Sequence, residues 1–175
     1  DLDHQPVIGH RGASGLAPEN TLPAFTLAVE EGADAIEFDV RLSSDGVPMV
    51  FHDPVLERTT DGSGPIGRQS AARLAGLNAG HRYSMDGISH PWRGRGAAIP
   101  RLEDVLERFP QTPLLIELKE VEAARPVLAL LRRHAAEARV LVGSFLEDAL
   151  IPFRFAGFAT SASRRGIALL TLRSS

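Results

Sequence analysis

Two carboxylates lie two residues apart in residues 35–41 (AIEFDVR), where every other residue except Arg41 is apolar. In a β-strand, side chains at positions i and i+2 leave the same face, so Glu37 and Asp39 would point to one side. Two neighbouring carboxylates repel each other and are costly to bury without a partner, and a hard divalent cation removes both penalties. The spacing therefore predicts a metal site, with a pair of solvated residues near a strand edge as the alternative.

A second strand-like run, residues 113–118 (PLLIEL), leads into the same spacing with Glu117 and Lys119. On one face of a strand, these residues would add a third carboxylate and a cation to the same interior. Lys119 is the only lysine beside 18 arginines, and lysine supplies a compact, mobile point charge that a guanidinium does not. The alternative is a buried ion pair with a structural role, although such pairs are poor stabilisers.

Two histidines end the runs that we predict to be the first and third strands. His10 is followed by Arg11, and His52 is followed by Asp53. Histidine can donate or accept a proton near neutral pH, and an arginine can hold a phosphate oxygen with its fork of donors. The other four histidines lack such surroundings and are interpreted as residues of the surface or of an insertion: His4, His81, His90 and His134.

The elements that would position these residues alternate along the chain. Strands are predicted at residues 6–10, 35–41, 48–52, 113–118, 140–142 and 158–160. Helices are predicted at residues 21–31, 102–109, 122–138, 146–155 and 163–172. This alternation is typical of βα units around a parallel sheet. The candidate residues all fall at or near the carboxyl ends of strands, where active sites of (β/α) barrels form, so the predicted fold class is an α/β TIM-type barrel.

Six βα units are predicted in this way, whereas a closed barrel has eight. We therefore expect the last two units to be missing from the given chain, residues 1–175, which we interpret as a single barrel domain. Residues 54–100 break the alternation after the third strand and are predicted to be an insertion. A loop of this length is usually a binding insertion or is disordered. It holds Tyr83 and Trp92, the only residues of their types.

Composition narrows the range of partners. The net charge of −3 gives no electrostatic reason for nucleic acid or an anionic membrane to be the main partner. The chain has no cysteine, which excludes disulfides and thiolate metal sites. No run approaches the roughly 20 apolar residues of a membrane-spanning helix, and the first residues do not resemble a signal peptide. The compartment and the oligomeric state stay open.

Four segments, in this order, resemble the glycerophosphodiester phosphodiesterase family. They are HRG (10–12) followed by PENT (18–21), E-x-D (37–39) running into DGVPMVFHD (45–53), IPRLEDVL (99–106), and ELK (117–119). The resemblance covers roughly residues 6–172. It implies a metal-dependent enzyme that hydrolyses a glycerophosphodiester, a small-molecule substrate, to glycerol 3-phosphate and an alcohol.

The resemblance also implies roles for individual residues. Glu37, Asp39 and Glu117 would bind a divalent cation, Mg²⁺ or Ca²⁺. His10 and His52 would be the general acid and base. The attacking group would be water or the neighbouring glycerol hydroxyl.

Four further residues would support this chemistry. Arg11 and Lys119 would bind the phosphate group. Glu19 and Asn20 would support the site from behind, with helix capping as an equally good interpretation. In addition to these four, Tyr83 and Trp92 of the insertion would wall one side of the substrate pocket.

Two other functions stay open at this point. One is a phospholipase D-like barrel that hydrolyses lipid head groups, because its E-x-D motif and paired histidines would look similar. The other is a catalytically inactive barrel that serves as a binding scaffold. The intact histidines and carboxylates argue against the scaffold.

Overall fold

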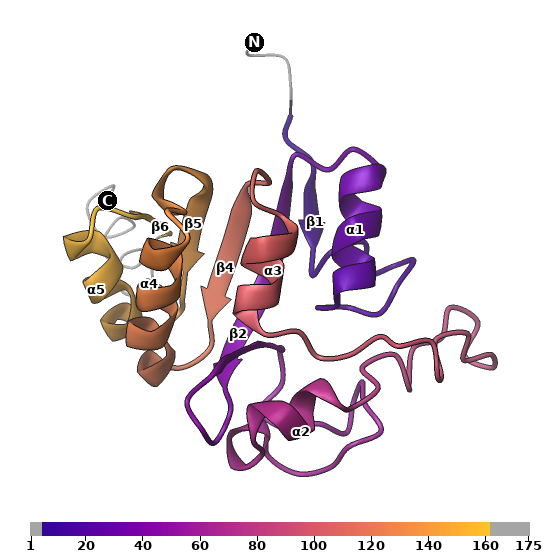
Figure 1. Ribbon diagram of the computed structural model, residues 1–175. Coiled ribbons are helices and arrows are strands. Elements are labelled where there is room, and N and C mark those ends of the chain that lie inside the picture. Colours follow the sequence, from indigo (N-terminus) through magenta and orange to yellow (C-terminus); the bar gives the residue numbers. More distant parts are fainter. Residues whose placement is uncertain (1–4, 162–175) are drawn as a thin grey trace, which may run out of the picture.

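The computed structural model describes residues 5–161 of the protein. Its centre is a parallel sheet with the strand order β1-β2-β4-β5-β6 (Figure 1). The parallel strands are β1 (Ile8–His10), β2 (Ala35–Leu42), β4 (Leu114–Leu118), β5 (Val140–Gly143) and β6 (Ala159–Thr160). Because neighbouring strands run parallel, their carboxyl ends meet at one edge of the sheet. This arrangement confirms the α/β class and is that of a (β/α) barrel wall.

The third strand departs from the prediction. β3 (Pro48–Val50) pairs antiparallel with β2, with Val40 opposite Val50. Only residues 43–47 separate the two strands, and a parallel connection needs a crossover of about a dozen residues or more. The interpretation of residues 48–52 as the strand of a βα unit is therefore wrong. The described residues contain five parallel strands and one hairpin strand, so the count of six βα units was too high.

Four helices cover one side of the sheet: α1 (Leu22–Glu30), α3 (Leu102–Arg108), α4 (Ala124–Arg133) and α5 (Glu147–Phe155). Thr21 begins α1 by accepting a hydrogen bond from the backbone of Ala24. Gly32, with φ of 85°, follows its end as predicted. The predicted helix at residues 163–172 lies outside the described residues.

The predicted helix at residues 122–138 is shorter in the structure. It is divided into the 3-10 turn η2 (Val121–Ala123), α4, and the 3-10 turn η3 (Glu137–Arg139). Ala135 adopts a positive φ of 46°, and the backbone N–H of Ala136 donates back to Leu131. This is the hydrogen-bonding pattern that closes a helix, usually with glycine at the turning position. The sequence has alanine there, so the end carried no local signal.

Apolar and polar residues alternate on the central strands as predicted. Phe38 of β2 is fully buried on the helix side, and its ring lies 5.4 Å from that of Phe25 of α1. Phe25 in turn contacts Phe109, with ring centroids 6.2 Å apart. Because these apolar side chains occupy one face of β2, its carboxylates must leave from the other face. The core thus fixes the direction of the site.

The insertion is ordered around a small core of its own. It contains the 3-10 turn η1 (Ile66–Arg68) and the short helix α2 (Ala71–Ala75). Its buried apolar cluster comprises Met49, Phe51, Leu56, Ile66, Ala71, Leu74, Ala79 and Ile99. Of the two alternatives for this loop, disorder is therefore wrong. Within residues 5–161, no helix combines the length and the apolar character needed to cross a membrane.

The turn after β1 requires glycine at position 12. Gly12 has φ of 79°, and a Cβ added there would lie 2.6 Å from the backbone carbon of Ala24. We expect Gly12→Ala to lower the free energy of unfolding by about 1–3 kcal/mol, measured by urea denaturation. Gly15→Ala is the matched control, since its Cβ would meet nothing within 4 Å. Equal stability of the two variants would contradict this explanation.

Candidate active site

Three carboxylates meet on the polar face of the central strands. Asp39 of β2 and Glu117 of β4 are directly paired across the sheet, and Glu37 precedes Asp39 by two residues. One oxygen from each of the three lies within 4.8 Å of the other two. The parallel register therefore produces a compact set of oxygen donors, the type that hard divalent cations prefer.

Lys119 neutralises part of this negative charge. Its Nζ lies 2.8 Å from Asp39 Oδ1 and 2.8 Å from Glu117 Oε1. The Asp39 side chain is only 1% exposed, and that of Lys119 is 14% exposed. The ion pair between Glu117 and Lys119 considered from the sequence therefore exists, but it includes Asp39 and lies within the carboxylate group.

The negative charge of Glu37 is unfavourable in the folded protein. Burial raises the pKa of Glu37 above its ordinary value of 4.5, and the negative charges of Asp39 and Glu117 raise it further. The backbone N–H of Arg11, 3.0 Å from Glu37 Oε2, and the charge of His10 oppose this shift without cancelling it. A cation bound beside Glu37 would relieve both the burial and the repulsion.

Arg11 connects the carboxylates to the loop after β1. Its Nε lies 3.2 Å from Asp39 Oδ2, and its Nη1 lies 2.9 Å from Glu19 Oε1. Arg11 has φ of 57°, a left-handed conformation that is uncommon outside glycine. This backbone turn directs the amide of Arg11 toward Glu37 and its side chain toward Asp39.

Asn20 holds Asp39 from behind. Its Nδ2 donates to Asp39 Oδ2 at 2.9 Å, and its Oδ1 accepts from the Asp39 backbone at 3.3 Å. Thr21, and not Asn20, is the N-cap of α1. Glu19 contacts Arg11 and Arg58. Of the two interpretations left open for Glu19 and Asn20, contact with the site fits their observed partners and helix capping does not.

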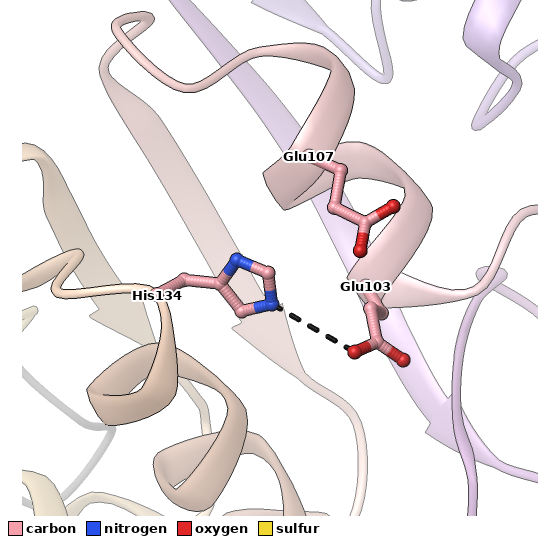
Figure 2. Close-up of side chains that lie close together, drawn as sticks. All are labelled: Glu103, Glu107 and His134. Atoms are coloured by element: carbon pink, nitrogen blue, oxygen red, sulfur yellow. Dashed lines mark ion pairs between the residues drawn. The ribbon is translucent and has the colours of Figure 1, made fainter.

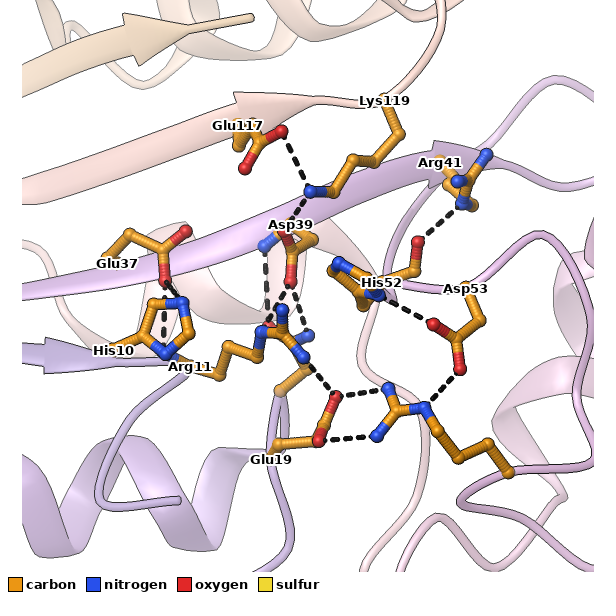
Figure 3. A network of polar contacts seen from close by, with 12 residues as sticks. His10, Arg11, Glu19, Glu37, Asp39, Arg41, His52, Asp53, Glu117 and Lys119 are labelled. Atoms are coloured by element: carbon orange, nitrogen blue, oxygen red, sulfur yellow. Dashed lines mark hydrogen bonds and ion pairs between the residues drawn. The ribbon is translucent and has the colours of Figure 1, made fainter. Parts of the chain in front are cut away.

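The two histidines flank the carboxylates. Figure 3 shows His10 beside Glu37, with Asp39 between it and His52 in this view. His10 Nε2 lies 3.8 Å from Glu37 Oε2, and the His10 side chain is largely exposed. His52 Nδ1 lies 2.6 Å from Asp53 Oδ1. All nine residues proposed from the sequence thus lie in one connected group or directly beside it.

Sequence reasoning missed two arginines of this network. Arg41 Nε donates to the backbone carbonyl of His52 at 2.7 Å (Figure 3). Arg58 binds both Asp53 and Glu19. Neither arginine stood out among the 18 in the chain. Asp53 carried a weak signal, because it directly follows His52 in the quoted motif.

The two aromatic residues of the insertion contact α1 and the loop after β1. Trp92 lines a hollow with residues of α1, among them Leu22 and Thr26, and does not line the pocket that contains Glu37 and Glu117. The place of Trp92 in a wall of the substrate pocket therefore stays a prediction. The Tyr83 hydroxyl donates to the carbonyl of Gly15 at 2.9 Å, which ties the insertion to the loop after β1.

A second group of possible metal ligands lies on the helices. Glu103 and Glu107 of α3 face His134 at the end of α4 (Figure 2). His134 Nε2 lies 3.8 Å from Glu103 Oε1, and Arg133 pairs with the same oxygen. The guanidinium of Arg133 already supplies a positive charge at Glu103. We therefore interpret this group as ion pairs that join α3 to the end of α4.

Residues 10–155 match the model of the Glycerophosphoryl diester phosphodiesterase family. The chain belongs to this family. The match begins at the last residue of β1, ends at the last residue of α5 and includes the nine proposed catalytic, phosphate-binding, metal-binding and supporting residues. The glycerophosphoryl diester phosphodiesterase family is divalent-cation dependent, and the three carboxylates could bind such an ion.

Individual family members support the assignment. YhdW of Bacillus subtilis is 40% identical over 153 residues, which are 85% of this chain and 60% of the relative. The glycerophosphoryl diester phosphodiesterase domain of Rv2277c from Mycobacterium tuberculosis superimposes with a TM-score of 0.86 at 33% identity, covering 93% of this chain and 61% of that one. This chain thus spans about 60% of the length of these relatives.

A structure with a bound product is also similar. A phosphodiesterase of Oleispira antarctica in complex with the product sn-glycerol-3-phosphate is 36% identical, with a TM-score of 0.76. The match covers 89% of this chain and 64% of that chain. The predicted TIM-type barrel class and the resemblance stated from the sequence motifs are both confirmed by these family members.

Proposed function

We propose that this protein hydrolyses glycerophosphodiesters to glycerol 3-phosphate and an alcohol in a reaction that depends on Mg²⁺ or Ca²⁺. The observation that carries the proposal is the set of three carboxylates within 4.8 Å, flanked by two histidines and two basic residues. The Oleispira relative, which binds the product sn-glycerol-3-phosphate, supports the same substrate class.

The cation would be held by Glu37, Asp39 and Glu117, because carboxylate oxygens are the ligands that a hard divalent ion prefers. Binding would also offset the unfavourable negative charge of Glu37. When bound, the cation would polarise the phosphoryl group and stabilise its developing negative charge. Mg²⁺ demands a stricter octahedral geometry than Ca²⁺, so comparing the two ions in the activity assay tests which one the site uses.

The remaining residues would bind the phosphate and move protons. Arg11 and Lys119 lie against Asp39 and would hold the phosphate oxygens beside the carboxylates. One histidine would take the proton of the attacking oxygen as the new P–O bond forms. The other would protonate the departing alkoxide as its P–O bond breaks. His10 and His52 are suited to these roles because they lie on opposite sides of Asp39 in Figure 3.

A pocket beside the carboxylates would receive part of the substrate. Glu37 and Glu117 line a cavity of about 200 Å³ together with the apolar residues Leu115, Leu141 and Phe145. A lining that combines charged and apolar side chains suits a phosphodiester that carries an organic group. The apolar side chains would influence which organic group is accepted.

The test is release of glycerol 3-phosphate from glycerophosphocholine. We expect activity to disappear with a chelator and to return when Mg²⁺ or Ca²⁺ is restored. Release of a cyclic or ceramide phosphate would instead support the phospholipase D-like alternative. Metal-independent binding of the diester without any turnover would support the scaffold alternative.

Replacing Glu37 by glutamine should affect stability and metal affinity in opposite directions. The pKa of Glu37 is raised in the folded protein. As the pH rises from 4.5 through this raised pKa, Glu37 must ionise in an unfavourable place, so the folded protein loses stability. Glu37→Gln should therefore increase the melting temperature of the metal-free protein at neutral pH. It should also weaken Mg²⁺ binding at least about tenfold.

The pH dependence of binding provides a second measure of the same residue. Protons compete with the cation for Glu37. As the pH is lowered, Mg²⁺ affinity should therefore begin to fall at a pH above 4.5, the ordinary pKa of a glutamate. Calorimetric titration at several pH values measures this decline, and differential scanning calorimetry measures stability. A variant that keeps the original affinity would remove Glu37 from the proposed ligand set.

A further inference from the structure

An unbroken chain of polar contacts runs from His52 to Arg11. His52 Nδ1 lies 2.6 Å from Asp53 Oδ1, and the other oxygen of Asp53 accepts from Arg58 Nε. Asp53 therefore uses one oxygen for the histidine and the other for the arginine. Since Asp53, Arg58 and Glu19 each have partners on both sides, a displacement of one affects the next.

Arg58 also reaches across to the loop after β1. Its Nη1 donates to Glu19 Oε2 at 2.8 Å, and its Nη2 donates to Glu19 Oε1 at 2.6 Å. Glu19 Oε1 accepts in addition from Arg11 Nη1 at 2.9 Å. A lysine could not replace Arg58, because only the planar guanidinium offers donors in fixed directions to two carboxylates at once.

The electrostatics keep both carboxylates ionised. Burial by itself would raise the pKa of Asp53, but hydrogen bonds and charge from Arg58 and His52 outweigh it and lower that pKa. Burial opposes ionisation of Glu19 in the same way, and Arg58 and Arg11 outweigh it. An ionised carboxylate only accepts hydrogen bonds. The ring nitrogen that faces Asp53 must therefore carry a proton.

In the neutral form of the ring, this determines the state of the opposite nitrogen. A neutral imidazole has one proton, so a proton on Nδ1 leaves Nε2 of His52 with a free lone pair. The backbone of His52 is held separately, because its carbonyl accepts from Arg41 Nε. Removing Asp53 would thus release the ring without releasing the backbone.

We infer that Asp53, held in place by Arg58, is a positioning residue that fixes the tautomer and orientation of His52 for proton transfer. Through Glu19, the same arginine links the His52 ring to Arg11, which the proposed function assigns to phosphate binding. The inference rests on that proposed function. It adds Asp53 and Arg58 to the residues on which turnover depends.

The first test compares Asp53→Ala and Asp53→Asn with the unchanged protein. We expect kcat to fall about 10- to 1,000-fold in both variants, with KM and Mg²⁺ affinity within about twofold. Asp53→Asn should not rescue activity, since its amide can donate to Nδ1 and favour the wrong tautomer. Circular dichroism and the melting temperature show whether each variant is folded.

A spectroscopic readout distinguishes positioning from a merely structural role. The ¹⁵N chemical shifts of the His52 ring, assigned by their loss in His52→Gln, report which nitrogen is protonated. In the unchanged protein we expect a proton on Nδ1 and none on Nε2. In Asp53→Ala we expect a mixture of tautomers. An unchanged tautomer together with an unchanged kcat would overturn the inference.

A double-mutant cycle tests the part played by Arg58. If Arg58 acts through Asp53, then Arg58→Ala should lower kcat, and adding it to Asp53→Ala should have little further effect. Arg154→Ala on α5 is the matched control, because Arg154 also pairs with a glutamate but lies outside this network. Additive losses in kcat would show that Arg58 acts independently and would contradict the proposed link.

Failure of the proposed function would look different. If the unchanged protein released no glycerol 3-phosphate with either metal, the proposed hydrolytic function would be wrong. The ¹⁵N measurement would still decide whether Asp53 sets the tautomer of His52, because it needs no turnover.

Discussion

His52→Gln should abolish measurable turnover and leave Mg²⁺ binding nearly unchanged. The Nδ1 of His52 faces Asp53, and its carbonyl accepts from Arg41. His52 does not belong to the group of side chains that could hold the cation. Removing it should therefore remove proton transfer alone. Loss of a general acid or base typically slows a reaction by about 10²- to 10⁴-fold.

Steady-state kinetics and calorimetric Mg²⁺ titration measure the two quantities separately. His134→Gln is a suitable control, because His134 lies at the end of α4 among Glu103 and Glu107 and should leave kcat unchanged. If His52→Gln lost both turnover and Mg²⁺ affinity, His52 would be a metal ligand. Its proposed role in proton transfer would then be wrong.

Asp39→Ala should have the largest combined effect of any substitution in the site. Asp39 is almost fully buried and lies against Lys119, Arg11 and Asn20. Its removal leaves Lys119 and Arg11, which are both mostly buried, each without one of their carboxylate partners. Breaking such a buried pair costs about 3 kcal/mol or more of stability. Metal binding and turnover should disappear together.

Asp39→Asn separates the two contributions. The amide has the same shape and keeps one oxygen, so we expect a smaller stability loss of about 1–2 kcal/mol but a similar loss of turnover. Urea denaturation and glycerol 3-phosphate release measure these effects. Glu107→Ala on α3 serves as the control for a carboxylate outside the site. Full activity in Asp39→Asn would show that turnover needs no charged carboxylate at position 39 and would contradict this prediction.

Local periodicity was sufficient to place the carboxylates. The alternation of Glu37 and Asp39 with apolar neighbours required both to leave the same face of β2, whatever the rest of the chain did. The helix over residues 22–30 was similarly predictable, because Thr21 and Gly32 mark its ends. These features depend on interactions within a few residues, and the sequence displays such interactions directly.

The direction of the third strand was less accessible. A run such as PMVFH is compatible with parallel or antiparallel pairing, and the local evidence was the Asp45-Gly46 turn and the short connection before it. The length of the connection decides the outcome, since residues 43–47 are too few for a crossover. The consequence is that His52 follows a hairpin strand and not a barrel strand.

The sequence by itself determined which residues could do the chemistry: carboxylates at alternate strand positions, histidines at strand ends and one lysine. Only the tertiary structure decided how they are connected. It placed Glu117 opposite Asp39 and Arg58 between Glu19 and Asp53. Periodicity specifies the face from which a side chain leaves, but strand register and loop packing specify which distant side chain it meets. Those depend on the burial of the whole core, which no local pattern contains.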